Sequence, residues 1–144
     1  FTPLEGIPMG TRTGDLDPAI IFYLRRRGFS GKEIFTMLHK KSGLLGVSEL
    51  SSDVRDLWAA YKRHDKRSVR TLDRFAYRIA KYIGAYTVAL GCLDCLVFTG
   101  GIGEHAWYLR KWILQYVRKT AKPQVLVIST DEERKIAEET TKIF

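Results

Sequence analysis

The stretch CLVFTGGIGE, residues 95–104, decides the fold class of this chain. Residues 95–99 are apolar and favour extended structure, so they predict a short buried strand. The glycines that follow break the strand, and we expect a helix from Glu104 or His105 to about Lys119. Glycine lets the backbone approach a ligand, and free N–H groups at a helix start can bind a phosphate. A tight turn without a ligand explains the pattern equally well, because it is neither a Walker A motif nor a complete G-x-G-x-x-G.

A second buried strand is predicted at residues 124–129, and residues 130–133 supply cap residues for a final helix. Apolar residues recur at spacings of three and four from Val69 to Leu90, which predicts a long helix with one buried face that ends at Gly91. Two strands that each lead into a helix indicate an α/β architecture with a parallel or mixed sheet. Because few strands are visible, we expect an incomplete sheet and a chain that is part of a larger protein.

Shorter helices are predicted in the first half of the chain, after an irregular segment of 17 residues rich in Gly, Pro and Thr. The helices are expected at residues 18–27, at residues 31–42 behind a capping box of Ser30 and Glu33, and at residues 54–61 behind cap residues 51–53. The sequence GLLG, residues 43–46, is predicted to be a turn.

The composition is that of a globular protein with 144 residues, and 24 Lys and Arg against 16 Asp and Glu give a net charge of +8. Such a surface attracts polyanions, but charge alone does not choose between a nucleotide and a nucleic acid. The two cysteines make no disulfide framework, so a reducing intracellular compartment is expected. No apolar run is long enough to span a membrane and no signal peptide is visible. Phe1 stands in place of a Met, so we expect the natural start to lie upstream.

Arg12 lies between two glycines in MGTRTGDLDP, residues 9–18. A guanidinium held in such an irregular segment can contact phosphoryl oxygens through two donors. It would stabilise the charge that develops on those oxygens during phosphoryl transfer. The alternative is that Arg12 pairs with Asp15 or Asp17 and braces a turn.

The sequence SDVR, residues 52–55, stands at a predicted helix start. Asp53 could accept hydrogen bonds from ribose hydroxyls or an adenine amino group, and Arg55 could stack on a base. The alternative is that Ser52 or Asp53 is a plain N-cap.

Carboxylates follow the second predicted strand in STDEE, residues 129–133. They could hold Mg²⁺ beside a nucleotide phosphate, directly or through water. The alternative is a capping box from Thr130 to Glu133. The two interpretations are compatible, because Glu133 can cap the helix while Glu132 faces a cleft.

Other chemistry-bearing residues favour structural roles. Cys92 and Cys95 have C-x-x-C spacing but no second pair to complete a zinc site, so we expect them to be buried. The three histidines are too scattered along the chain to make a metal cluster. The basic runs at residues 25–27 and 62–67 are interpreted as solvated helix ends rather than a nucleic-acid patch.

Several of these motifs, taken in order, resemble the acetate kinase family within the actin-like and sugar-kinase ATPase superfamily. The resemblance rests on FTPLEG at residues 1–6, MGTR at 9–12, GDLDP at 14–18, SGLLG at 42–46, SDVR at 52–55, AKYIGAY at 80–86 and FTGGIGE at 98–104. It covers nearly the whole chain, and propionate and butyrate kinases are the relatives. It implies that residues 1–144 are the C-terminal nucleotide-binding domain of a two-domain enzyme. The implied fold is an actin-like, ribonuclease H-like α/β domain, rich in helix, with a partial mixed sheet.

The resemblance also implies an activity and its residues. Such enzymes transfer the γ-phosphoryl group of ATP reversibly to acetate with Mg²⁺, giving acetyl phosphate and ADP. They dimerise largely through this domain, which would give the helix from Val69 to Leu90 a partner, and a cytoplasmic location is implied. By motif match, Arg12 would stabilise the transferring phosphoryl group, Asp53, Val54 and Arg55 would line the adenosine site, Gly101, Ile102, Gly103, Glu104 and His105 would hold the nucleotide, and Glu132 would be the Mg²⁺-associated glutamate.

The chain departs from the family pattern in three places. His105 stands where the family has Asn, Ser129 and Asp131 stand where it has Pro and Asn, and the stretch between Glu104 and Gln124 is shorter than in family members. We therefore expect a nucleotide-binding and dimerising half that is inactive alone. The alternatives are a non-catalytic nucleotide-binding or dimerisation module of the same fold, and a basic nucleic-acid binder supported by charge alone.

Overall fold

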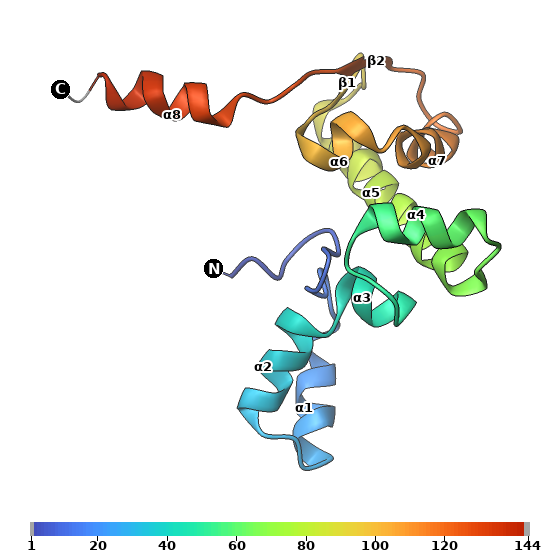
Figure 1. Ribbon diagram of the computed structural model, residues 1–144, viewed down its shortest axis with the longest axis vertical. Coiled ribbons are helices and arrows are strands. Elements are labelled where there is room, and N and C mark those ends of the chain that lie inside the picture. The colour runs from blue at the N-terminus through green and yellow to red at the C-terminus, as the bar shows by residue number, and fades with distance from the viewer. Residues whose placement is uncertain (1, 143–144) are drawn as a thin grey trace.

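A computed structural model describes residues 2–142, and the long helix α5 forms its axis (Figure 1). Most of the described residues are helical, and two short strands lie beside one end of α5. In chain order the elements are α1 (Ala19–Arg26), α2 (Gly31–Lys40), α3 (Gly43–Ser48), α4 (Val54–Lys62), α5 (Lys66–Leu90), β1 (Cys95–Phe98), α6 (Gly100–His105), α7 (Trp107–Val117), β2 (Gln124–Val127) and α8 (Glu132–Thr140).

The predicted helix boundaries hold where a local capping signal sets them. Ser30 and Glu33 form the expected capping box at the start of α2. The Asp53 side chain accepts from the Arg55 backbone N–H and caps α4. Gly91 ends α5 in the left-handed conformation, with φ of 81°, as predicted.

The hydrophobic core lies where α4 and α7 pack against α5. Leu57, Leu72 and Leu109, one from each of these helices, are almost completely buried. Burying each of these side chains contributes about 1.5–3 kcal/mol. In α5 only the N-terminal half is buried, because Tyr86 and Leu90 remain 63% and 71% exposed. The predicted apolar face is therefore continuous in sequence, but only half of it is covered by the described residues.

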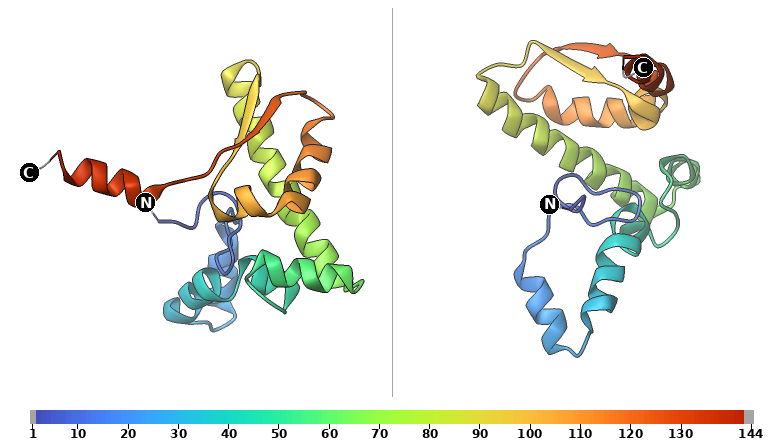
Figure 2. Two further views of the ribbon diagram at one scale, coloured as in Figure 1. Left: turned by 45° about the horizontal axis from the view of Figure 1, so that its top comes forward. Right: turned by 90° about the vertical axis from the view of Figure 1, so that its left-hand side faces the viewer.

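Strands β1 and β2 pair in parallel, with Leu96 opposite Val125. One face of this ribbon packs on the core through Leu96 and Val125. Val97 and Leu126 point to the other face and stay exposed, although both strands were predicted to be buried. The prediction is confirmed for the inner face, where Phe98 is buried, and is wrong for the outer face, which nothing among the described residues covers. Figure 2 shows the two-stranded sheet of β1 and β2 beside α6 and α7, with no described element over its outer face.

Three local predictions are corrected by the structure. Cys92 and Cys95, which were expected to be buried, are both exposed. The segment at 43–46 is the start of helix α3 and not an isolated turn. Two helices are present where one was expected from Glu104 to Lys119. Helix α6 already begins at Gly100, and Ala106 separates it from α7 because its backbone, with φ of −86° and ψ of 65°, is not helical.

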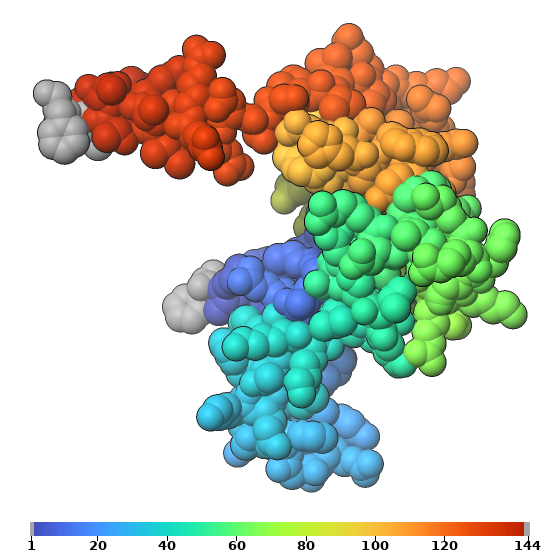
Figure 3. Space-filling view, in the orientation of Figure 1, coloured from blue at the N-terminus to red at the C-terminus, as the bar shows by residue number. Residues whose placement is uncertain are grey.

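Two segments project from the core (Figure 3). Helices α1 and α2 form a hairpin at one end, and α1 contains no buried residue. Helix α8 extends away from the rest and also contains no buried residue. Within residues 2–142, no helix is both long and apolar enough to cross a membrane.

Candidate functional site

An open cavity of about 700 Å³ lies between the start of α4 and helix α6. It brings together two sequence segments that are nearly fifty residues apart. The candidate site residues that line it are Asp53, Val54, Arg55, Gly101, Ile102 and His105. Gly103 and Glu104, which belong to the same predicted set, do not line it.

The start of α4 presents a carboxylate and a guanidinium that are already paired. The Arg55 Nη2 atom lies 2.6 Å from Asp53 Oδ2, and the Arg55 backbone N–H donates to Asp53 Oδ1 over 2.8 Å. These hydrogen bonds from Arg55 lower the pKa of the Asp53 carboxyl to about 2. The Arg55 side chain is 87% exposed, so one guanidinium face remains open to a ligand. Asp53 is therefore the N-cap that the alternative predicted, and it also lines the cavity, while its contact with a nucleotide stays a prediction.

Two aromatic residues in the cavity wall were missed by sequence reasoning. The rings of Trp58 and Tyr108 stack with centroids 4.0 Å apart and an interplanar angle of 3°. The Tyr108 hydroxyl donates to the Val54 carbonyl over 3.4 Å, which ties α7 to the start of α4. Trp58 lies one helical turn after Val54, so helix periodicity could have placed it on the same face. No local signal links Tyr108 to this site.

The three glycines of helix α6 have different structural roles, and only Gly101 lines the cavity. Gly100 has φ of +69°, which a residue with a side chain rarely adopts. A Cβ atom on Gly103 would lie 3.2 Å from the Phe98 carbonyl carbon, so Gly103 permits close packing of α6 on β1. Gly101 has no neighbour within 4 Å of such a Cβ atom, and it is the glycine that leaves open space in the cavity.

Glu104 contacts the C-terminal segment instead of the cavity. Its Oε1 atom accepts from the Thr130 backbone N–H over 3.0 Å and from the Thr130 hydroxyl over 3.2 Å. These bonds lower the pKa of the Glu104 carboxyl, with the backbone donor as the largest cause. Glu104 therefore fixes the chain between β2 and α8.

Arg12 lines a second open cavity, of about 630 Å³, which adjoins the first because Ser52 lines both. The Arg12 Nη1 atom lies 4.0 Å from Met9 Sδ, and no ion pair to Asp15 or Asp17 is present among residues 2–142. The alternative, in which Arg12 pairs with Asp15 or Asp17 and braces a turn, is therefore not observed among these residues. The Arg12 guanidinium is exposed and free to meet a ligand.

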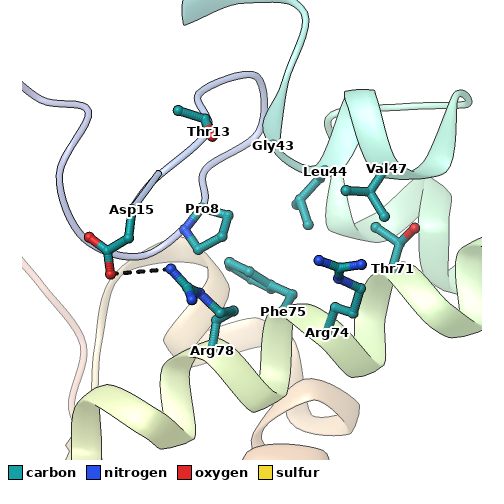
Figure 4. A pocket seen from close by; sticks show the side chains of 10 residues that line it. All are labelled: Pro8, Thr13, Asp15, Gly43, Leu44, Val47, Thr71, Arg74, Phe75 and Arg78. Carbon is teal, nitrogen blue, oxygen red and sulfur yellow. Dashed lines mark hydrogen bonds and ion pairs between the residues drawn. The ribbon is translucent and has the colours of Figure 1, made fainter. Parts of the chain in front are cut away.

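Asp15 braces the segment that carries Arg12, as Figure 4 shows in part. Its Oδ1 atom accepts from the Gly6 backbone N–H over 2.8 Å. Its Oδ2 atom accepts from the Tyr82 hydroxyl over 2.6 Å and from Arg78 Nη2 over 3.2 Å. The Tyr82 hydrogen bond is the main reason that the pKa of the Asp15 carboxyl is lowered and that of the Tyr82 phenol is raised. The irregular N-terminal segment is thereby attached to α5.

Glu132 lines neither cavity. It is the first residue of α8, its side chain is exposed, and it makes no hydrogen bond or ion pair within the described chain. The predicted capping box from Thr130 to Glu133 is not formed, because Asp131 caps α8 by accepting from the Arg134 backbone N–H over 3.0 Å. No group of three or more His, Cys, Asp or Glu side chains within residues 2–142 could hold a metal ion.

Two parallel strands, each followed by a helix, and a cavity beside the glycine turn after β1 define an α/β domain of the actin-like ATPase type. Solved structures share this fold. The chain is similar to the crystal structure of Porphyromonas gingivalis acetate kinase, with a TM-score of 0.90 and 37% identity over 99% of this chain and 42% of the other. It is similar also to a propionate kinase from Francisella tularensis, with a TM-score of 0.85 and 35% identity over 92% of this chain and 39% of the other.

Residues 1–142 match the Acetokinase family, and the chain belongs to that family. A curated relative, acetate kinase from Desulforamulus reducens, is 46% identical over 166 aligned residues, which cover 99% of this chain and 42% of the relative. The chain therefore spans about two fifths of the length of such relatives. Because the alignment is longer than the 144 residues of this chain, the relative also has residues without a counterpart here.

Proposed function

We propose that residues 1–144 form the C-terminal nucleotide-binding domain of an acetate kinase. In the complete protein this domain would take part in reversible transfer of the ATP γ-phosphoryl group to acetate, giving acetyl phosphate and ADP. The observation that carries the proposal is the pair of adjoining cavities, one lined by the SDVR and glycine-turn motifs and the other by Arg12. Two cavities that share Ser52 can hold the two ends of one elongated ligand, such as a nucleoside triphosphate.

The larger cavity suits the nucleoside end of that ligand. Val54 and Ile102 offer apolar contacts, while Arg55 presents a free guanidinium face on which a base can stack. The open backbone at Gly101 leaves room for a ribose or a phosphate. His105 closes the same wall with a ring nitrogen that can donate or accept a hydrogen bond.

Arg12 suits the phosphoryl end. In phosphoryl transfer the protein mainly positions the groups and neutralises charge on the equatorial oxygens. A guanidinium on a braced segment is already oriented, so little reorganisation opposes its contact with those oxygens. The attacking acetate carboxylate would approach the γ-phosphorus in line with the departing ADP oxygen. The groups that hold acetate are expected largely outside these residues.

The Mg²⁺ ion that accompanies ATP needs oxygen ligands, and Mg²⁺ sites commonly use one or two carboxylates together with substrate phosphates. The Glu132 carboxylate fits this chemistry, because it has no partner within residues 2–142. Its position on α8 is outside both cavities. When bound, Mg²⁺ would neutralise phosphate charge, and we propose Glu132 as the residue of this chain that holds it, directly or through water.

We propose a homodimer for the complete protein, with α5 contributing to its interface. The exposed C-terminal half of this helix supports that assignment, since Tyr86, Val88 and Leu90 are 63%, 83% and 71% exposed. Exposed apolar side chains gathered on one helix segment often mark an interaction surface. Sedimentation of the complete protein, wild type against Val88→Glu, would test it, because a dimer through this surface should dissociate in the variant.

Calorimetric titration of the 144-residue chain with ATP and Mg²⁺ tests the proposed nucleotide site. We expect weak binding, and we expect that Gly101→Leu abolishes it, because a leucine side chain would extend into the open space of the cavity. Gly84→Ala is the matched control, since Gly84 is a helical glycine with equally open surroundings on α5. Equal binding by Gly101→Leu would contradict the site.

The hydroxamate-coupled acetate kinase assay tests whether the 144-residue chain catalyses the reaction without the rest of the protein. We expect negligible turnover by the 144-residue chain, and activity near that of a complete acetate kinase would contradict the assignment of a half-site. The alternative, a non-catalytic dimerisation module, predicts neither heat nor a thermal shift on addition of nucleotide. The same titration therefore separates the two proposals.

A further inference from the structure

A second positively charged side chain lines the cavity of Arg12. Besides the loop at residues 9–12, the wall of this cavity includes Phe35, His39 and Lys40 from the end of α2. Arg12 and Lys40 are both charged at neutral pH, and no Asp or Glu is among the described residues that line the cavity. An open cavity of about 630 Å³ with two cations and no acid has room and charge for a polyanion.

The chain itself does not neutralise the Lys40 ammonium. Lys40 is the last residue of α2, its side chain is exposed, and it forms no ion pair within residues 2–142. A lysine at a helix C-terminus also interacts favourably with the helix dipole, which is the alternative explanation for its position. The dipole accounts equally for Lys41, which lines a different cavity beside Phe29 and Glu33. The two neighbouring lysines therefore differ in the cavity that each lines and not in charge.

His39 lines the same cavity as Lys40, but its ring is bound to its own helix. The Nδ1 atom lies 3.0 Å from the Phe35 carbonyl oxygen, which can only accept, so Nδ1 carries a hydrogen. The ring also stacks on that of Phe35, with centroids 3.8 Å apart. Nε2 is then the ring nitrogen left for a ligand, and in the neutral ring it is an acceptor that does not suit a phosphate oxygen. Lys40 is therefore the donor that this wall offers to an anion.

Both neighbours of Arg12 are hydrogen-bonded to the end of α2, which lies against the N-terminal segment (Figure 2). The Thr11 hydroxyl donates to the His39 carbonyl over 3.0 Å. The Thr13 backbone N–H donates to the Leu38 carbonyl over 3.1 Å. These bonds satisfy two carbonyl groups at the helix end and attach the Arg12 loop to it.

The backbone of Lys40 is held on both sides by the same loop. The preceding residue, His39, accepts from Thr11, and after Lys40 the Ser42 backbone N–H donates to the Thr11 carbonyl over 2.9 Å. The positions of Arg12 and Lys40 relative to each other are thus fixed before any ligand binds. Such preorganisation lowers the cost of binding one anion with both side chains.

We propose that Lys40 is a second phosphate-binding residue of this cavity, an inference that rests on the proposed function. Arg12 would contact the transferring γ-phosphoryl group, and Lys40 would bind nonbridging oxygens of the phosphate chain beside it. Lysine suits this task because its compact ammonium offers three donors to oxygens within reach. These oxygens are charged in the bound substrate as well as in the transition state. Lys40 would therefore contribute mainly to affinity, whereas Arg12 contributes to rate.

Calorimetric titration of the 144-residue chain with inorganic tripolyphosphate tests Lys40 without depending on the nucleoside cavity. We expect binding by the wild type and about tenfold weaker binding by Lys40→Gln, the loss of one charge-assisted contact. Lys41→Gln is the matched control with unchanged affinity, because it removes the same charge one residue away, outside the Arg12 cavity. Both variants should fold normally, since both side chains are exposed.

Steady-state kinetics of the complete protein give a second readout. Lys40→Gln should raise the KM for ATP about tenfold with little change in kcat, the signature of a contact made equally in the ground state and the transition state. Arg12→Gln should mainly lower kcat. A role in the helix dipole alone would lower the stability of both lysine variants and leave tripolyphosphate binding and the KM unchanged.

Three results would overturn the inference. No tripolyphosphate binding by the wild type, or wild-type affinity in Lys40→Gln, removes the contact. Equal losses of affinity in Lys40→Gln and Lys41→Gln would reduce the effect to net charge. Failure of the proposed function is distinguishable, because a chain that binds tripolyphosphate through Lys40 but does not bind ATP contradicts the nucleotide site alone. A chain that binds ATP equally with and without Lys40 contradicts this inference alone.

Discussion

Replacing Gly43 by alanine is expected to destabilise the chain by about 3–5 kcal/mol. Gly43 has φ of +61°, and a Cβ atom at this position would lie 2.1 Å from the Met9 carbonyl oxygen and 2.7 Å from that of Arg12. The left-handed conformation alone costs an alanine about 1–2 kcal/mol. The clashing atoms belong to the backbone, so no side chain can rotate away and the two chain segments must separate.

That separation sets the rest of the magnitude. Three backbone hydrogen bonds hold the Arg12 loop against α3 and the residue before it, and each contributes about 1 kcal/mol. A shift of more than 1 Å would break two or three of them, adding about 2–3 kcal/mol to the cost of the left-handed conformation. The bonds join the Ser42 N–H to the Thr11 carbonyl, the Leu44 N–H to the Met9 carbonyl and the Leu45 N–H to the Gly10 carbonyl, each over 2.9 Å.

Urea unfolding followed by helical circular dichroism measures the change in the free energy of unfolding. Gly84→Ala is the matched control, since Gly84 lies in α5 with no atom within 4 Å of an added Cβ and its φ is not in the left-handed range. The control should be about 1 kcal/mol more stable than wild type, because alanine favours helix. A loss below 1 kcal/mol in Gly43→Ala would refute the reasoning that backbone contact forces glycine there.

Three further outcomes are expected from the same structure. Arg12→Gln in the complete protein should lower kcat for acetate phosphorylation about 10²–10³-fold with a small change in the KM for ATP, and an unchanged kcat in steady-state assays would remove Arg12 from catalysis. Because the pKa of Asp53 is lowered to about 2 in the folded chain, its carboxylate stabilises the fold above pH 4, and this contribution is lost as the pH falls from about 4 to 2. Stability measured across that range should therefore fall less in Asp53→Asn than in wild type, and parallel curves would contradict it. Leu109→Ala should cost about 3–5 kcal/mol in urea unfolding, since Leu109 is 1% exposed in the core, and a loss below 1 kcal/mol would show that the site collapses around the cavity.

Local signals were enough to predict most helix ends. The capping box at Ser30, the N-cap at Asp53 and the left-handed end at Gly91 each depend on residues within a few positions of one another. Their free energy comes from contacts that the neighbouring sequence already contains. A prediction from sequence therefore finds them without knowledge of the fold.

Long-range contacts explain what the sequence did not predict. Helix α3 forms where GLLG indicated a turn, because the loop that precedes α1 accepts backbone hydrogen bonds from its first residues, more than thirty positions away. Tyr108 joins the cavity lined by Asp53 and Gly101 only because α7 folds onto α4. One cavity is lined by both Asp53 and Gly101, as the motifs suggested, whereas Glu132 lines neither that cavity nor the adjoining one beside Arg12.

The error about strand burial has a physical origin of its own. Val97, Leu126 and Val127 are apolar and β-favouring, yet they are 46%, 37% and 48% exposed. An apolar sequence pattern indicates that a segment is buried in the complete protein, because exposing many apolar side chains to water is unfavourable. The exposed face of the sheet and the exposed end of α5 at Leu90 are thus the places where the sequence pattern and the described contacts disagree. Both are explained together if further parts of the complete protein cover them, as expected for a chain that spans 42% of a relative's length.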